Sequence, residues 1–377
     1  MSTAPTSMPV SAEEFRRRVI DPSEFVADEQ AFVDVRLDRS RGKASYSLIG
    51  PGVSQNAAQS VSLTEPRCFN FGGASMPHGC VNNPHLHFTA EVFICTRGHW
   101  AMRVGEHGEH ELIMGPGTIF SVPTWVFRGF ENLGDDDGWL FTVLGGDETG
   151  GILWAPSVLR EAAATGLYLG TDHTLRDADA GDSIEDVVEP LDETQLQWLR
   201  PVTDADLQAR VVPRESLDWS DRALLSHILP GCSTSLAPVI GAGMTEHRDH
   251  RAPITVAHGF SIEWLRVAPG SHVGEHRLVG SQVLILVDGD WDVALNSGPD
   301  RTSERPAPGS VVSVPPGAWR DFANIGTVEA HAIVVNEGDA PSRIEWSTDT
   351  VDRAREAGWA RDAGGFLAPA ALIGARS

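Results

Sequence analysis

Two long stretches of this 377-residue chain repeat each other, and the repeat constrains the fold more than any other feature. The first stretch runs from Gly79 to Gly166 and the second from Gly270 to Gly358. At an offset of 191 residues, the block Gly79-x5-His85-x-His87-x3-Glu91-x6-Gly98 aligns with Gly270-x5-His276-x-Leu278-x3-Gln282-x6-Gly289. A second block, Gly117-x5-Pro123 with Arg128 and Asn132, aligns at an offset of 192 with Gly309-x5-Pro315, Arg320 and Asn324. A duplication of this length predicts two domains of the same fold.

Short apolar runs separated by glycine and proline fill both copies, as at 92–95, 118–122, 283–287 and 310–314. Short strands at regular spacing, with Gly and Pro turns between them, indicate an all-β sandwich or barrel. Helical patterns are confined to short segments, 11–20 and 203–211 before the two copies and 156–166 and 347–358 at their ends. We therefore expect two β-barrels with short flanking helices.

The repeat and the composition together suggest domain borders. We expect an N-terminal helical or extended arm at 1–38, a first barrel at 39–170 and a second barrel at 211–358. Between the barrels, 171–210 is acidic and poor in large apolar residues, which is typical of an exposed linker with a short helix. A short C-terminal tail remains at 359–377.

The first copy carries a candidate metal site. His85, His87 and Glu91 have the same parity along the chain, so on strands their side chains project to one side. Two imidazoles and one carboxylate form the set that binds non-haem Fe(II) and leaves coordination positions open for O2 and substrate. Imidazole ligands favour iron, with manganese, nickel, copper or zinc as alternatives, over calcium or magnesium.

Both blocks resemble the two signature motifs of the cupin superfamily, G-x5-HxH-x3/4-E-x6-G and G-x5-PxG-x2-H-x3-N. The first copy matches the whole of motif one, but in motif two it has Trp125 for a glycine and Arg128 for a histidine. The resemblance covers about two thirds of the chain and implies a bicupin with two jelly-roll barrels, often assembled into homo-oligomers. It also implies that the histidine replaced by Arg128 would have been a further metal ligand.

Arg128 has two interpretations that the sequence leaves open. It can clamp a substrate carboxylate or enolate beside the metal through a bidentate interaction. Alternatively, it forms a structural ion pair with Glu91, in which case the barrel could be one that binds no metal. Because Arg320 stands at the same position in the other copy, the arginine is not necessarily tied to metal chemistry.

The second copy lacks a full ligand set. Its ligand positions hold His276, Leu278, Gln282 and Arg320, and leucine cannot ligate a metal. His272 could replace a missing ligand, but we interpret it, together with His247, His250 and His258, as an exposed loop histidine. We expect this barrel to be free of metal and to support assembly.

Composition limits the partners. A net charge of -23 argues against binding to nucleic acid or to an anionic membrane, and favours a small molecule. The four cysteines show no regular spacing and the N-terminal residues show no signal peptide, so we expect a cytoplasmic protein with reduced thiols. Side chains near the candidate site suggest an apolar substrate pocket: Thr89, Phe93, Trp125 and Phe127.

These observations predict a metal-dependent, O2-using oxidoreductase. The resemblance points to the bicupin dioxygenases, among them quercetinase-like enzymes that cleave rings, acting on a small aromatic or enol-type substrate. Two alternatives remain. One is a non-oxidative isomerase, lyase or decarboxylase in which the metal polarises a carbonyl. The other is a binding bicupin without catalytic activity.

Overall fold

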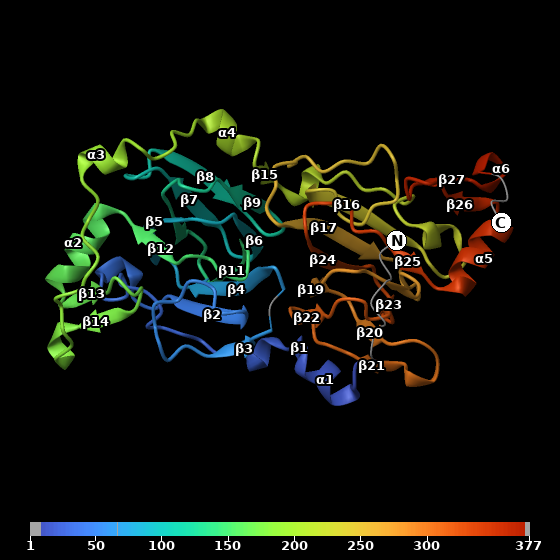
Figure 1. Cartoon of the computed structure of the whole chain (residues 1–377), viewed down its shortest axis with the longest axis horizontal. Coiled ribbons are helices and arrows are strands. Elements are labelled where there is room, and N and C mark those ends of the chain that lie inside the picture. The colour runs from blue at the N-terminus through green and yellow to red at the C-terminus, as the bar shows by residue number, and fades with distance from the viewer. Residues whose placement is uncertain (1–8, 66, 374–377) are drawn as a thin grey trace. The chain divides into compact units, whose positions relative to one another are not determined.

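The structure of the protein, a computed structural model, describes residues 9–65 and 67–373 (Figure 1). It divides into two compact units, Phe25–Ser216 and Leu217–Ser377, the latter joined by the described residues of Met1–Glu24. These borders differ from those expected from the sequence, because the N-terminal arm is split between the units. None of the described helices is long and apolar enough to cross a membrane.

The unit Phe25–Ser216, called here the first barrel, consists of two facing sheets and a short hairpin (Figure 1). The larger sheet has the order β15-β9-β6-β11-β4-β2-β3 and the smaller one β12-β5-β10-β7-β8. The strands are β2 (Ala44–Ile49), β3 (Val61–Leu63), β4 (Phe69–Met76), β5 (Val81–His87), β6 (Glu91–Arg97), β7 (Trp100–Val104), β8 (His110–Met114), β9 (Ile119–Val122), β10 (Arg128–Asn132), β11 (Gly138–Gly145), β12 (Ile152–Trp154), β13 (Leu167–Leu169), β14 (Leu175–Asp177) and β15 (Val211–Val212). Its helices are α2 (Pro156–Ala164), α3 (Glu193–Leu196) and α4 (Asp204–Gln208).

The second barrel has the same plan. Its sheets have the orders β1-β22-β19-β24-β17-β16 and β21-β20-β23-β18-β25, and a hairpin of β26 and β27 follows them. The strands are β1 (Val19–Ile20), β16 (Thr234–Ile240), β17 (Phe260–Val267), β18 (His276–Arg277), β19 (Gln282–Asp288), β20 (Trp291–Leu295), β21 (Thr302–Glu304), β22 (Val311–Val314), β23 (Arg320–Asn324), β24 (Ala330–Glu337), β25 (Glu345–Trp346), β26 (Trp359–Arg361) and β27 (Leu367–Pro369). Its helices are α1 (Ala12–Arg17), α5 (Thr348–Glu356) and α6 (Ala370–Ile373).

Each barrel is held together by apolar side chains between its two sheets. Alternate residues of the strands point inward, so the short apolar runs of the sequence form one buried face per sheet. In the first barrel the fully buried core includes Phe93, Trp100 and Phe120. In the second it includes Leu284 and Trp291. The predicted all-β chain of two jelly-roll barrels with short flanking helices is confirmed.

Each of the four segments predicted to be helical contains a helix, but α1 ends at Arg17 and α4 at Gln208, earlier than expected, because the strands β1 and β15 follow them. Pro156 occupies the first turn of α2, where its missing N–H costs no helix hydrogen bond. Ser11 and Ser347 accept backbone N–H groups at the starts of α1 and α5.

The segment that precedes each copy of the repeat adds a strand to the barrel formed by the other copy. In the second barrel, β1 pairs antiparallel with β22, with Val19 opposite Val312. In the first barrel, β15 pairs with β9, with Val211 opposite Phe120. This exchange explains why the N-terminal residues up to Glu24 belong to the unit that starts at Leu217.

Candidate metal centre

Two strands of the first barrel carry the candidate ligands, and two more pair with the strand that carries both histidines. His85 and His87 lie at the end of β5, and Glu91 begins β6 after a three-residue turn. In β10, Arg128 lies opposite His85, while β12 places Trp154 opposite His85 from the other side. Strand pairing on both sides of β5 therefore fixes the direction in which the imidazoles project.

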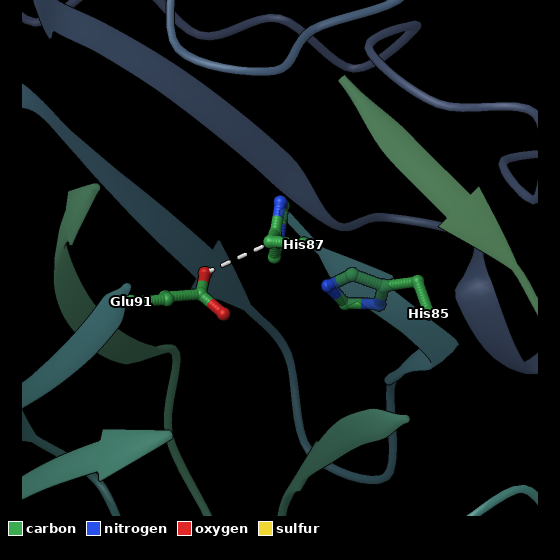
Figure 2. A group of neighbouring side chains, drawn as sticks. All are labelled: His85, His87 and Glu91. Atoms are coloured by element: carbon green, nitrogen blue, oxygen red, sulfur yellow. Dashed lines mark ion pairs between the residues drawn. The ribbon is translucent and has the colours of Figure 1, made fainter. Parts of the chain in front are cut away.

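The structure brings the three side chains together. One ligand atom from each of His85, His87 and Glu91 lies within 4.8 Å of the others, and all three residues are buried. The Nε2 atom of His87 lies 3.5 Å from Oε1 of Glu91. In Figure 2 the Glu91 carboxylate and both imidazoles point toward one another.

Both imidazoles are held in the neutral form. Burial is the main reason why the pKa of His85 is lowered to about 3, and the positive charge of Arg128 contributes to this shift. Burial and then Arg128 also hold the pKa of His87 well below its ordinary value. Nδ1–H of His85 donates to the Asn83 carbonyl oxygen at 2.7 Å, so Nε2 carries the free lone pair. Neutral imidazole is the form that ligates metals.

Glu91 forms a buried ion pair with Arg128. The Nε atom of Arg128 donates to Oε2 of Glu91 at 2.8 Å, and Nη1 donates to the Val126 carbonyl at 3.0 Å. The third nitrogen, Nη2, has no hydrogen-bond partner among the described residues. Burial raises the pKa of Glu91, whereas the Arg128 charge opposes that rise. The pair occupies Oε2 and leaves Oε1 facing His87.

The residues fit a divalent transition metal. Metal–ligand bonds of about 2.1 Å place adjacent ligand atoms roughly 3 Å apart. Side-chain shifts of about 1 Å or less would therefore bring the three ligand atoms to bonding distance from one ion. Asn83 supplies the hydrogen bond that orients His85, and Arg128 orients Glu91, as residues next to metal ligands commonly do. The site has three protein donors, which leaves further coordination positions open.

The three candidate ligands share a cavity of about 70 Å³ inside the first barrel. Much of its wall is apolar, with Phe32, Phe93, Phe130, Leu144 and Ile152 among the lining residues. For scale, one water occupies about 30 Å³ of liquid, whereas a cavity that holds benzene measures about 150 Å³. The cavity therefore suits a ligand smaller than an aromatic ring.

The structure separates the side chains expected to form the substrate pocket. Phe93 lines the cavity. Thr89 lies in the turn between β5 and β6, where the strand alternation is interrupted, and is absent from the cavity wall. Trp125 and Phe127 line a separate surface depression of about 300 Å³. Trp125 has a φ of +60° and is 46% exposed, so the backbone turns its ring outward.

Two charged residues that no sequence motif indicated lie near the candidate ligands. Lys43 lines the cavity together with His85, His87 and Glu91. Asp34, which is fully buried, pairs with Lys43 and accepts hydrogen bonds from the backbone N–H and the side-chain amide of Asn83. Both precede the repeated blocks, where no motif marks them. Comparison of the two copies could have indicated Lys43, because the uncharged Thr234 stands at its position in the second copy.

In the second barrel the corresponding positions form a hydrogen-bonded network. Nη1 of Arg320 donates to Gln282 at 3.1 Å, and Gln282 donates to Asn336 at 2.8 Å. His276 keeps the orientation of its counterpart, with Nδ1–H donating to the Gly274 carbonyl at 2.7 Å. Leu278 is buried beside them.

The upstream histidines of the second barrel do not match their interpretation as exposed loop residues. His250 and His258 are 4% and 6% exposed, so that prediction was wrong for both. His272 is partly buried between Asp321, 2.9 Å from Nδ1, and Cys232, 3.5 Å from Nε2. The hydrogen bond to Asp321 is the main reason why the pKa of His272 is raised to about 10.

Neither a protein-family model nor a curated protein sequence matches the chain. Among solved structures, it is similar to an oxalate decarboxylase of Lactobacillus farciminis in complex with formate, with a TM-score of 0.55, 11% identity and coverage of 89% of this chain and 90% of that one. It is also similar to the oxalate decarboxylase of Bacillus subtilis, with a TM-score of 0.53, 12% identity and coverage of 91% and 80%. The vicilin of hazelnut, Corylus avellana, has a TM-score of 0.50, 11% identity and coverage of 86% of both chains. At such identities the likeness concerns the fold.

Proposed function

Because this chain has the two-barrel fold of the bicupins, we propose that it is a metal-dependent enzyme whose reaction takes place in the first barrel. One observation carries the proposal: two neutral imidazoles and a carboxylate converge on a buried cavity. Burying three such groups without a common ligand is costly, which argues against a purely structural role.

We propose an oxidoreductase that uses O2, with Fe(II) held by His85, His87 and Glu91. A bound Fe(II) would supply the electron transfer to O2, and two histidines with one carboxylate are the ligand set that many such enzymes use. Manganese, nickel, copper and zinc remain alternatives, because the same donors bind them.

The surrounding residues support this chemistry by holding the ligands in place. Arg128 fixes one oxygen of Glu91 and balances its charge, so the carboxylate keeps one orientation. Asn83 fixes the tautomer of His85. The apolar wall of the cavity, including Phe93 and Phe130, excludes water from reactive species.

The size of the cavity narrows the substrate. About 70 Å³ is roughly half the volume of a cavity that holds benzene, so it supports a small enol-type or acid substrate over an aromatic one. A molecule of about two or three carbon atoms fits that space.

A second candidate is the decarboxylation of a small acid without net oxidation. The small cavity and the likeness to two proteins described as oxalate decarboxylases favour it. In that case the metal would act as a Lewis acid.

The test is an oxygen-uptake assay on the full chain reconstituted anaerobically with Fe(II), Mn(II) or Zn(II). Small acids such as pyruvate and oxalate are compared with catechol. We expect metal-dependent O2 uptake with a small acid, absent in His85→Ala and in His87→Ala but retained in His276→Ala, the second-barrel change that matches His85→Ala. Release of CO2 without O2 uptake would support the second candidate. The absence of any metal-dependent turnover across these substrates would contradict both.

A further inference from the structure

Lys43 is the only lysine in the chain. It lies directly before β2, is 6% exposed and lines the cavity that contains His85, His87 and Glu91. Lysine and arginine are not interchangeable, since the ammonium is a compact point charge with three donors whereas the guanidinium is a planar fork. A sole lysine in this cavity therefore calls for a specific explanation.

Burial lowers the pKa of Lys43, whereas the ion pair with Asp34 opposes that fall and holds the ammonium group in place. Nζ pairs with the fully buried Asp34 and donates to Oδ1 of Asn82 at 2.7 Å. It also lies 5.2 Å from the ring centre of Phe32 and 5.7 Å from that of Trp154, within the range of cation–π attraction. A neutral amine would leave the Asp34 carboxylate as a buried charge without a cation, which is strongly unfavourable.

Lys43 retains a donor for a ligand. An ammonium group has three N–H donors, and among the described residues two of them have acceptors, on Asp34 and Asn82. Because Lys43 forms part of the cavity wall, the third donor can serve a molecule in the cavity.

The internal repeat provides a comparison. At the offset of 191 residues, Lys43 and Asp34 correspond to Thr234 and Leu225, neither of which is charged. The barrel that has the three candidate ligands thus has the lysine–aspartate pair, and the barrel that lacks the ligands lacks the pair. A pair needed only to hold the barrel fold together would be expected in both copies.

The charges of the site favour an anionic ligand. Asp34 balances Lys43, and Glu91 balances Arg128. Imidazole ligands contribute no charge, so the two positive charges of a bound divalent metal would have no counterpart in the protein. In a cavity of low polarity, an anion beside the metal and the lysine is strongly favoured over a neutral molecule.

We propose that Lys43 is a positioning residue that binds the carboxylate of a small acid in the first barrel, an inference that rests on the proposed function and specifies its substrate as an anion. Asp34 holds the ammonium directly and also accepts from the side-chain amide of Asn83, whose carbonyl oxygen orients His85. Strand β5, which contains Asn82, Asn83 and His85, thereby connects the site of the carboxylate with a candidate metal ligand.

The sole lysine permits a direct test. The full chain is produced with lysine carrying 13C at Cε, so that its NMR spectrum contains one lysine signal. It is titrated with glycolate and with the neutral analogue glycolamide, each in the presence and in the absence of Zn(II), a diamagnetic divalent metal. We expect glycolate to shift the Lys43 signal and glycolamide to leave it nearly unchanged. Equal shifts with both, or none with either, would overturn the proposal.

Substitutions separate anion binding from folding. Lys43→Met alone leaves Asp34 without its cation, so the double variant Lys43→Met/Asp34→Asn, which removes both charges, is the main comparison. In the Zn(II)-loaded protein we expect glycolate to bind about tenfold or more weakly to the double variant than to the wild type, with glycolamide unaffected. Calorimetry gives the two dissociation constants. Unchanged glycolate binding in a folded double variant would refute the role of Lys43.

The two proposals fail in distinguishable ways. A glycolate-dependent shift of the Lys43 signal without metal-dependent turnover would retain the anion site and reject the enzyme. Metal-dependent turnover with glycolate affinity independent of Lys43 would retain the enzyme and reject this inference.

Discussion

At the scale of single residues, Arg128 controls the electrostatics of the first barrel. It is fully buried, donates to Glu91 and lies opposite His85 on the neighbouring strand. Its charge lowers the pKa of both candidate ligand histidines in addition to the effect of burial. Its role as a structural ion-pair partner is therefore directly visible in the contacts, while its remaining nitrogen leaves capacity for a ligand.

Replacing Arg128 with methionine should destabilise the metal-free protein. The variant retains most of the side-chain volume but leaves Glu91 as a buried carboxylate without its cation, which typically costs about 3–5 kcal/mol. Urea unfolding of the metal-free protein measures the loss. A bound divalent metal should restore part of it, since the metal also balances Glu91. A loss below about 1 kcal/mol would mean that the ion pair contributes little.

The three candidate ligands were recognisable in the sequence, whereas the charged residues beside them were not. His85, His87 and Glu91 could be grouped from the sequence because alternate residues of a strand project to the same face. Lys43 and Asp34 lie in an irregular segment before β2. Such a segment has no residue periodicity from which the direction of a side chain could be predicted. Trp125, two residues after Pro123, has a positive φ. A backbone turn of this kind changes the side-chain direction that strand parity would predict.

At the scale of elements, the strands of the second barrel enclose a polar network in place of a ligand set. Glu263 on β17 is fully buried and accepts from Asn336 at 2.9 Å and from the backbone N–H of Met244 at 3.1 Å. Asn336 on β24 connects it to Gln282 on β19. Burial raises the pKa of Glu263 to about 7, and the two donors only partly oppose this.

Glu263 should make stability depend on pH between its ordinary pKa of 4.5 and about 7. In this window the unfolded chain has released the proton that the folded barrel retains, so the free energy of unfolding falls as the pH rises. The contribution is complete below pH 4.5 and lost above about pH 7, a change on the order of 3 kcal/mol.

Chemical denaturation from pH 4 to pH 8 measures this dependence. Glu263→Gln should flatten the curve and be more stable than the wild type at pH 8, whereas Glu356→Gln, at an exposed helix position, should follow the wild type. Parallel curves for Glu263→Gln and the wild type would show that the carboxyl does not titrate in this range.

Element prediction succeeded where local signals were strong. The helices α2 and α5 follow from proline, serine and glycine end signals, and the long strands follow from apolar runs. The two-residue strands β1 and β15 could not be predicted, because their pairing with β22 and β9 depends on which barrel each preceding arm joins.

At the scale of the whole molecule, the duplication produced two units with separate apolar cores and unequal sites. A ligand stabilises only the unit that binds it, by about 4 kcal/mol at a thousandfold excess over its dissociation constant. Calorimetry should therefore show two unfolding transitions, and added Zn(II) or Fe(II) should raise the midpoint temperature of only one of them. A metal-induced rise of both transitions in His87→Ala would contradict the assignment of the metal to the first barrel.

The central claim is that the first barrel binds a metal through His85, His87 and Glu91. Elemental analysis of the full chain, purified without chelators, tests it most directly, beside His87→Ala and, as a histidine control in the second barrel, His276→Ala. The account predicts about one transition-metal ion per chain in the wild type and in His276→Ala, and a loss of most of it in His87→Ala. A wild-type chain that binds no metal even after reconstitution, or a His87→Ala chain that retains a full equivalent, would contradict it.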